Sequence, residues 1–322
     1  PVLRVNGRLF RTRHDVLTPE AAKKLVYSIL TADQKKHFES EKELDFSLAA
    51  DRKRRYRVNV YLQKQAVAAA LRPIPDEIPG LDTLGLPEGV QKFPDAKQGL
   101  LLVTGPTGHG KTTTQAAIID RINTTRECHV ITVEDPIEFV HTHKKSIIDQ
   151  REVGEDTHGF ISALRYILRQ NPDVIQIGEM RDLETIQAAL RAAETGHLVM
   201  ATLHTNDAIQ SVDRVIDVFP GEQQQQIRFM LSMTLLGIIS QRLLPRKDGK
   251  GRVLAAELLL NNTAVANLIR EGKTHQVYSI METNTREGMV TMDKAIKQLY
   301  MDGIISYDEA IAHVRSPKQF SK

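Results

Sequence analysis

Cysteine is nearly absent from this chain of 322 residues, which contains Cys128 alone and has no tryptophan. A single cysteine excludes an internal disulfide and a zinc site made of several cysteines. It fits a protein of a reducing compartment, so we expect a cytoplasmic location. Long apolar runs are also missing. The longest candidate, residues 229–240, is shorter than the roughly 18 residues needed to cross a bilayer, and we expect it to form a buried helix.

Neither sign of charge is in large excess. The chain has 43 Lys and Arg against 40 Asp and Glu, a net charge of +3, which is too small by itself to indicate nucleic-acid binding. A hydrophobic content of 41% and a charged content of 26% are ordinary for a soluble globular protein. The length allows two domains with a full-sized core.

Residues 105–112, Gly-Pro-Thr-Gly-His-Gly-Lys-Thr, fit the phosphate-binding loop pattern G-x-x-x-x-G-K-[ST]. An uncharged apolar segment precedes them and a helix-forming segment follows, which is the context that a phosphate cradle needs. A chance glycine turn is the alternative, and both flanks argue against it. The sequence therefore predicts binding of a nucleoside triphosphate, and the absence of an N-K-x-D guanine motif favours ATP.

The loop provides groups for both phosphates and metal. Its backbone N–H groups and the start of the following helix should face the phosphates. Lys111 can reach the β- and γ-phosphates, and the hydroxyl of Thr112 can ligate Mg²⁺. His109 occupies a variable position, and we expect its side chain to point to solvent. The residues predicted to bind nucleotide here are Gly105, Pro106, Thr107, Gly108, His109, Gly110, Lys111, Thr112 and Thr113.

Three parts follow one another along the chain. Residues 1–72 combine a hairpin pattern around Asn6-Gly7 with helix starts and alternating segments, which predicts a small α+β domain. Residues 73–98 contain five prolines and are interpreted as an interdomain linker that partly packs. Residues 99–322 alternate apolar strands with helices, which predicts an α/β fold with a mostly parallel sheet covered on both faces.

In the third part, ligands should bind at the carboxyl ends of the strands. Besides the strand before the phosphate-binding loop, strands are expected at 129–134, 173–177 and 198–203. Helices are expected near 156–169, 182–195, 207–218 and 222–244, followed by a helical tail from Asn261 with stops at Gly272, Gly288 and Gly303.

Two acidic segments follow predicted strands. Glu134, Asp135 and Glu138 form the first, and acids this close together favour a nearby cation or Mg²⁺-phosphate over a solvated turn. Glu179 ends the second strand and resembles a Walker B acid, although Gly178 stands where an aspartate is often found. Whether Glu179 holds Mg²⁺, directly or through water, or polarises the attacking water stays open at this point.

Histidine and arginine complete the set of candidates. His204 follows the strand at 198–203, where it can hydrogen-bond the γ-phosphate or serve a structural role, whereas His197 precedes that strand and should lie away from the phosphates. The basic run 52–57, with Arg72 further on, is either a solvated edge or an arginine finger supplied across an interface. Because no aromatic stacking motif accompanies the run, no nucleic-acid partner is expected.

Six motifs in order resemble the retraction ATPases of bacterial type IV pili, within the secretion ATPase superfamily. They are GPTGHGKTTT (105–114), ITVEDPIEFV (131–140), QREVGEDT (150–157), GEMRDLET (178–185), AAETGHLVMATLHT (192–205) and ISQRLLP (239–245). Residues 264–271, AVANLIRE, also resemble the retraction signature AIRNLIRE, with Ala266 in place of its first arginine. The resemblance runs from near Val2 to the C-terminus.

The resemblance implies a hexameric motor that couples hydrolysis of ATP, with Mg²⁺, to pilin disassembly and twitching motility. Each subunit would join a PAS-like N-terminal domain, here expected to be truncated at its start, to a RecA-like ATPase domain. The motor would be cytoplasmic and peripherally associated with the inner membrane, through a platform protein of the pilus machine. The implied catalytic residues are Lys111, Glu138, which matches the water-activating carboxylate, Glu179, and His204 with His197.

The resemblance also places Arg55, Arg57 and Arg72 in a region that supplies basic residues to the nucleotide, without telling which of them contacts phosphate. The extension-type relatives carry a zinc motif of several cysteines, which this chain cannot form, so no zinc is expected. The alternatives are a type II or type IV secretion-system ATPase and, in other classes, a RecA-like nucleic-acid translocase or a module that holds ATP without hydrolysing it.

Overall fold

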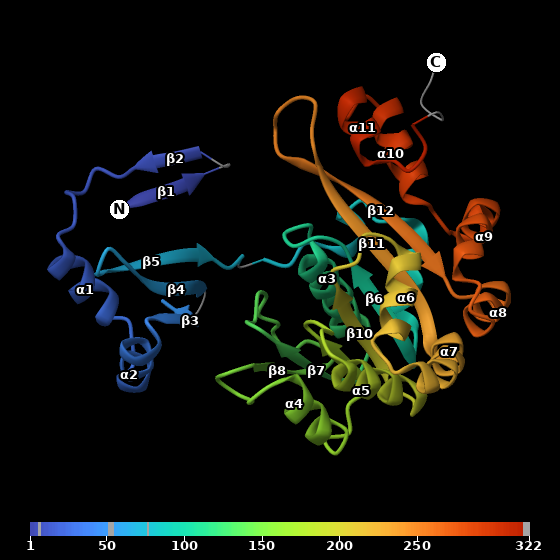
Figure 1. The fold of residues 1–322 in the computed structure, drawn as a ribbon, viewed down its shortest axis with the longest axis horizontal. Helices are drawn as coiled ribbons and strands as arrows, with labels where there is room; N and C mark the ends of the chain where they lie inside the picture. Colours follow the sequence, from blue (N-terminus) through green and yellow to red (C-terminus); the bar gives the residue numbers. More distant parts are fainter. Residues whose placement is uncertain (6–7, 51–54, 76, 318–322) are drawn as a thin grey trace. The chain divides into compact units, whose positions relative to one another are not determined.

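The computed structural model describes residues 1–5, 8–50, 55–75 and 77–317, and the chain divides into two compact units, Pro1–Glu77 and Ile78–Lys322 (Figure 1). The boundary falls inside the proline-rich stretch 73–98. Residues after it pack with the second unit, because Leu81 and Val90 are buried in its core.

The first unit contains a hairpin, two helices and a three-stranded antiparallel sheet. The predicted hairpin is confirmed, with Val5 opposite Arg8, while its Asn6-Gly7 turn lies outside the described residues. The elements are β1 (Val2–Val5), β2 (Arg8–Arg11), α1 (Pro19–Tyr27), α2 (Ala32–Glu41), β3 (Glu43–Ala49), β4 (Arg55–Gln63) and β5 (Ala66–Pro73). Apolar residues at alternate positions of β4 point to the core, where Val58 and Val60 are fully buried.

The second unit is built on a seven-stranded sheet in the order β12-β11-β6-β10-β9-β7-β8. Its strands are β6 (Gly99–Thr104), β7 (His129–Glu134), β8 (Ile147–Glu152), β9 (Val174–Ile177), β10 (Leu198–Leu203), β11 (Leu235–Pro245) and β12 (Arg252–Leu260). All neighbouring strands are parallel except β11 and β12. The predicted mostly parallel sheet is therefore confirmed.

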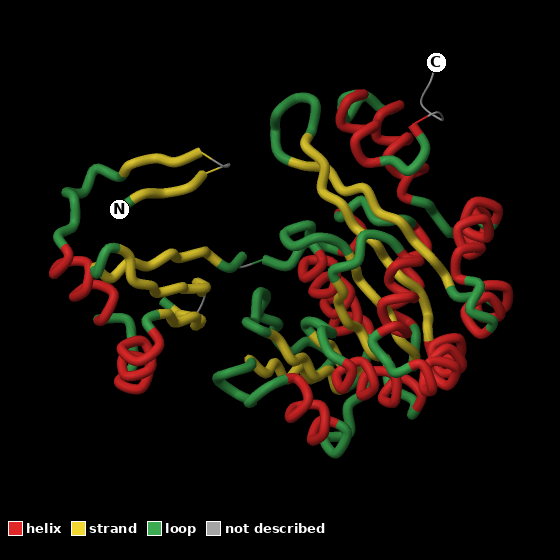
Figure 2. The backbone as a smooth tube through the Cα atoms, viewed as in Figure 1, coloured by secondary structure: helices red, strands yellow, loops and turns green. Residues whose placement is uncertain are grey.

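Helices cover both faces of this sheet (Figure 2). Leu100 and Leu102 of β6 pack into the core beneath α4 to α8, whereas Leu101 and Val103 pack on the other face against α3. The helices are α3 (Lys111–Thr125), α4 (Phe160–Ile167), α5 (Leu183–Glu194), α6 (Ala208–Asp217), α7 (Gly221–Thr234), α8 (Thr263–Arg270), α9 (Val277–Thr283), α10 (Met292–Met301) and α11 (Tyr307–His313). Because both faces are covered, the central strands β6, β9 and β10 are buried at every position and mostly apolar, whereas the edge strand β8 is largely polar.

The predicted helix at 222–244 is wrong in its second half, and so is the buried helix expected at 229–240. The helix α7 ends at Thr234, and the next eleven residues form β11, which lies between β6 and β12. A continuous apolar run has no periodicity that distinguishes a buried strand from a buried helix. Strands β8 and β12 were also missed, whereas the glycine stops of the helical tail are confirmed at Gly272, Gly288 and Gly303, each of which has a positive φ angle.

Among the residues that the structure describes, no helix is long and apolar enough to cross a membrane.

Candidate active site

The phosphate-binding loop connects β6 to α3 at the carboxyl edge of the sheet. Gly105, Gly108 and Gly110 have φ angles of 140°, 77° and 84°, which side-chain-bearing residues rarely adopt. At Gly105 space is limiting as well, since a Cβ atom would lie 2.4 Å from the carbonyl oxygen of Gln241 on β11. The predicted strand–loop–helix context is confirmed, and this backbone geometry requires glycine.

Lys111, the first residue of α3, folds back over the loop. Its Nζ donates hydrogen bonds to the carbonyl oxygens of Gly105 (2.8 Å) and Pro106 (3.1 Å). Burial lowers the pKa of Lys111, while the negative charges of Glu179 and Glu138 oppose that shift. The ammonium group is thus held between the loop and the two predicted carboxylates.

Glu179 and His204 meet beside the loop, at the ends of β9 and β10. His204 Nε2 lies 2.9 Å from Glu179 Oε1, and its Nδ1 faces the Thr107 hydroxyl (3.4 Å) and Lys111 Nζ (3.5 Å). Because an ammonium group can only donate, Nδ1 is the acceptor in the neutral ring, and Nε2 carries the proton donated to Glu179 in both the neutral and the charged ring. His204 therefore bridges the loop and Glu179, two parts of the site that lie far apart in the sequence.

Arg181 also binds Glu179, a contact that the sequence analysis missed. Its Nε lies 2.6 Å from Glu179 Oε1, and its side chain is 75% exposed. Burial alone would raise the pKa of Glu179, but the hydrogen bonds and charges of Arg181 and His204 outweigh it and hold that pKa below its usual value. The motif GEMRDLET (178–185) was the available signal, since Arg181 stands two residues after the acid.

Gly178 explains the departure from the Walker B pattern. Its N–H donates to the carbonyl oxygen of Val133 on β7 at 2.8 Å. A Cβ atom at this position would lie 3.2 Å from that oxygen and 3.4 Å from Cα of Glu134, closer than common contacts. The close approach of β7 disfavours an aspartate here, and the acid follows one residue later.

The first acidic segment follows β7, as predicted. Glu134 is 5% exposed and accepts hydrogen bonds from Thr132 (2.7 Å) and Gln150 (3.1 Å). Burial raises its pKa to about 7, against the lowering effect of these hydrogen bonds. Glu138 is half-buried on the loop beyond.

His109 does not point to solvent, so that expectation was wrong. Its Nδ1 accepts a hydrogen bond from the backbone N–H of Leu243 on β11 at 2.9 Å. Burial lowers its pKa, and the nearby positive charges of Arg252 and Lys111 add to this effect. Arg252 donates to the carbonyl oxygen of Gly108 at 3.1 Å, so β11 and β12 both support the loop.

The remaining predicted residues divide between the two units. Thr112 and Thr113 lie in the first turn of α3, directly after Lys111. His197 lies before β10, where its Nδ1 is 3.0 Å from the carbonyl oxygen of Ala192 on α5. Arg55, Arg57 and Arg72 belong to the first unit and lie on β4 and β5.

Taken together, a phosphate-binding loop and a carboxylate–histidine pair at the carboxyl edge of a mostly parallel sheet define a P-loop ATPase. Residues 80–312 match the family model described as "Type II/IV secretion system protein", and the chain belongs to this family.

Comparisons over the full chain show which members of this family the chain resembles. The chain is 46% identical to the type IV pilus retraction ATPase PilT of Pseudomonas aeruginosa, over 99% of this chain and 93% of the relative. It is 44% identical to a twitching motility protein of Neisseria gonorrhoeae, over 100% and 86% of the two chains. The crystal structure of the pilus retraction motor PilT with bound ADP superimposes with a TM-score of 0.93 and 52% identity, covering 99% of this chain and 91% of that one.

Proposed function

We propose that this protein is a motor ATPase that couples ATP hydrolysis to the retraction of type IV pili. The observation that carries the proposal is the assembly of Lys111, Glu179 and His204 around one phosphate-binding loop, in a chain similar along its whole length to pilus retraction ATPases. The same similarity favours twitching motility as the cellular readout.

The chemistry assigns a different task to each group. Lys111 Nζ exchanges its loop carbonyls for phosphate oxygens, and the loop N–H groups bind the same phosphates. Glu138 accepts a proton from water as the water oxygen bonds to the γ-phosphorus and the β–γ bridging oxygen leaves with the ADP. His204 donates to Glu179 in the absence of nucleotide, and it is placed to contact the γ-phosphate and to respond to its loss.

The residues present also fit Mg²⁺. A threonine hydroxyl and a carboxylate are the hard oxygen ligands that this ion prefers, and Thr112 and Glu179 supply them beside the loop. When bound with ATP, Mg²⁺ neutralises charge that develops on the phosphates. Thr112 would hold it directly, and Glu179 directly or through water.

Arginines of the first unit are proposed to reach the nucleotide of a neighbouring subunit. Arg57 on β4 pairs with Arg72 on β5, and Arg55 lies two residues from Arg57 on the same face. Like charges directly opposite each other destabilise a sheet, so their placement favours an anionic partner. Because Arg55 donates to Ser47 at 3.0 Å, Arg57 and Arg72 are the better candidates for phosphate contact.

A trans contribution of this kind requires an oligomer, and we infer the homo-hexamer that the family resemblance implies. The motor would act from the cytoplasm on a platform protein of the pilus machine in the inner membrane, and would associate with that membrane peripherally.

Deletion of the gene in its host tests the proposal. Twitching should stop and surface pili should accumulate, and the wild-type gene should restore both while Lys111→Ala should not. If the deletion strain twitches normally but fails to secrete proteins, the chain serves a secretion machine instead.

A further inference from the structure

The loop that carries Glu138 is fixed from β8 on its C-terminal side. Gln150 Nε2 donates to the carbonyl oxygen of Phe139 at 2.8 Å, and Gln150 Oε1 accepts the N–H of His141 at 2.7 Å. The oxygen and the nitrogen of one side-chain amide thus hold backbone groups one and three residues after Glu138. The loop itself is neither helix nor strand, so it lacks the regular backbone hydrogen bonds of those elements. The side-chain contacts from Gln150 hold its backbone instead.

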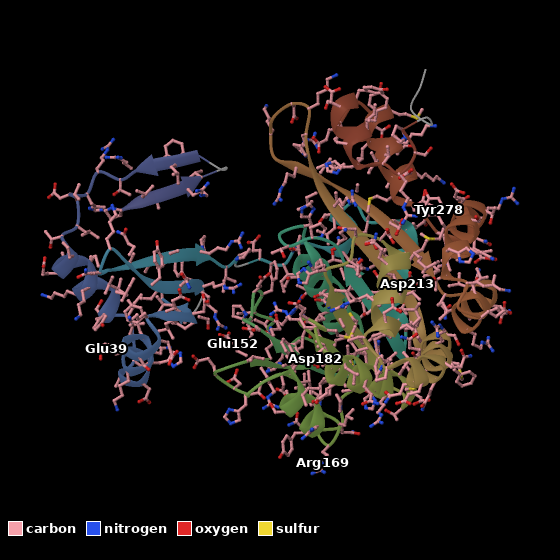
Figure 3. All side chains as sticks on the ribbon, viewed as in Figure 1. Glu39, Glu152, Arg169, Asp182, Asp213 and Tyr278 are labelled. Carbon is pink, nitrogen blue, oxygen red and sulfur yellow. The ribbon has the colours of Figure 1, made fainter. Side chains whose placement is uncertain are left out.

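Two buried carboxylates hold the same loop on its N-terminal side. Glu152, labelled in Figure 3, ends β8 and accepts the N–H of Ile137 through Oε2 at 3.2 Å. Glu134, which ends β7, accepts the backbone N–H of Glu138. These contacts fix the backbone of Glu138 and leave its carboxylate for other partners.

The two sides are joined through Gln150. Its Nε2 also donates to Glu134 Oε1 at 3.1 Å, and the hydroxyl of Thr132 donates to the same oxygen at 2.7 Å. In the register of β7 and β8, Thr132 lies opposite Gln150 and Glu134 opposite Glu152. All four therefore share one face of the two strands, since side chains alternate along a strand.

We propose that Gln150 is a positioning residue for ATP hydrolysis, which acts by holding the backbone on both sides of Glu138 so that its carboxylate meets the attacking water. The proposal rests on the proposed function, and it assigns Gln150 a role exerted through the backbone around Glu138. A displacement of about 1 Å at a reacting group can reduce a rate about 10²-fold, which gives positioning a measurable effect.

The first test is a change at Gln150 that keeps its volume. Gln150→Met removes all three hydrogen bonds, and kcat for Mg-ATP hydrolysis should fall by about 10- to 100-fold while KM for ATP stays nearly constant. Asp149→Asn is the matched control on β8, because Asp149 points to the opposite face and pairs with His129. It should leave kcat unchanged. Wild-type kcat in Gln150→Met, or an equal loss in Asp149→Asn, would overturn the proposal.

Folding is monitored by circular dichroism and by nucleotide binding. If Gln150→Met does not fold, Gln150→Asn replaces it, since it keeps the amide on a chain too short to reach both partners. The same loss of kcat is expected from this variant, and wild-type kcat in it would equally overturn the proposal.

The second test asks whether Gln150 acts through Glu138. In a Glu138→Gln background, Gln150→Met should cause no further loss of kcat, because the group that it positions is already absent. Multiplicative losses would show that Gln150 acts elsewhere and would overturn the proposal. Failure of the proposed function looks different: a chain that is no ATPase would show no hydrolysis in the wild type, and an ATPase of another machine would leave twitching intact in the deletion strain while the effect of Gln150→Met on kcat persists.

The pH dependence of kcat distinguishes the positioning of Glu138 by Gln150 from an effect of Gln150 on the ionisation of Glu134. Thr132→Val removes one donor to Glu134 without touching the loop, and Glu138 and Glu152 are the carboxyl groups that face Glu134. Losing a donor raises the pKa of Glu134, so the acid limb of kcat should move to higher pH with its plateau intact. Gln150→Met should move the limb and also lower the plateau. A plateau loss as large in Thr132→Val would assign the effect to Glu134 and overturn the role of Gln150.

Discussion

Glu179 is held in its ionised form by two donors, and one of them, Arg181, is mostly exposed. An exposed ion pair of this kind adds only about 0–1 kcal/mol to stability. We therefore expect the ion pair between Arg181 and Glu179 to affect the ionisation of Glu179 more than the stability of the fold. The pKa of Glu179 lies below its usual value, so the ionised form persists until the pH falls through that low pKa.

Arg181→Met should move this transition to higher pH, because burial continues to raise the pKa of Glu179 while one of the groups that lower it is gone. The measurement is the titration of the Glu179 carboxyl group followed by NMR, because the acid limb of turnover is assigned to Glu134. Arg181→Lys retains the charge and should preserve most of the lowering of the Glu179 pKa. An unchanged Glu179 titration in Arg181→Met would show that Arg181 does not hold this carboxylate in its ionised form.

At the scale of elements, α8 presents one face to the core and another to solvent. Val265 and Ile269 are fully buried, whereas Asn267 and Arg270 are exposed and joined by a hydrogen bond of 2.9 Å. The helical tail expected from Asn261 is confirmed in this segment, and the buried face of α8 packs within its own unit. Under the proposed function, the exposed polar face of α8 is the surface that would contact the platform protein.

Arg270→Ala should spare ATPase activity in vitro and abolish pilus retraction in cells, because the exposed side chain leaves the packing of α8 unchanged. Both assays are made on one variant. A proportional fall of hydrolysis and twitching would instead assign the helix to the ATPase core. Lys273→Ala, at an exposed position just beyond α8, is a control for loss of positive charge.

Local sequence patterns were enough to predict the strands and the loop that position the site. The features that were not predicted depend on contacts between residues far apart in the sequence. The strands His129–Glu134 and Leu198–Leu203 were predicted to the residue, since both are apolar and bounded by turns or helices. Strand β11 was missed because its role depends on pairing with β6, more than a hundred residues earlier in the chain. The contact of His109 with Leu243 was not predicted for the same reason, because it depends on the position of β11 in the sheet.

At the scale of the whole molecule, a ring in which arginines act in trans has a testable consequence. Arg57→Ala and Lys111→Ala should each inactivate a pure hexamer. Random mixing of equal amounts pairs an intact loop with an intact neighbouring arginine at about a quarter of the sites, so activity should return in part. Mixtures that stay inactive, or full activity of a strictly monomeric species in light scattering, would contradict the trans arrangement.

The most direct measurement compares ATP turnover and ATP binding in Glu138→Gln, with Lys111→Ala beside it. The glutamine cannot accept the proton of water, so kcat should fall by about 10²–10⁴-fold while the affinity for ATP stays the same. Lys111→Ala should weaken both, because its ammonium group contacts the phosphates themselves. Turnover of Glu138→Gln within about twofold of the wild type would contradict general-base catalysis by this carboxylate.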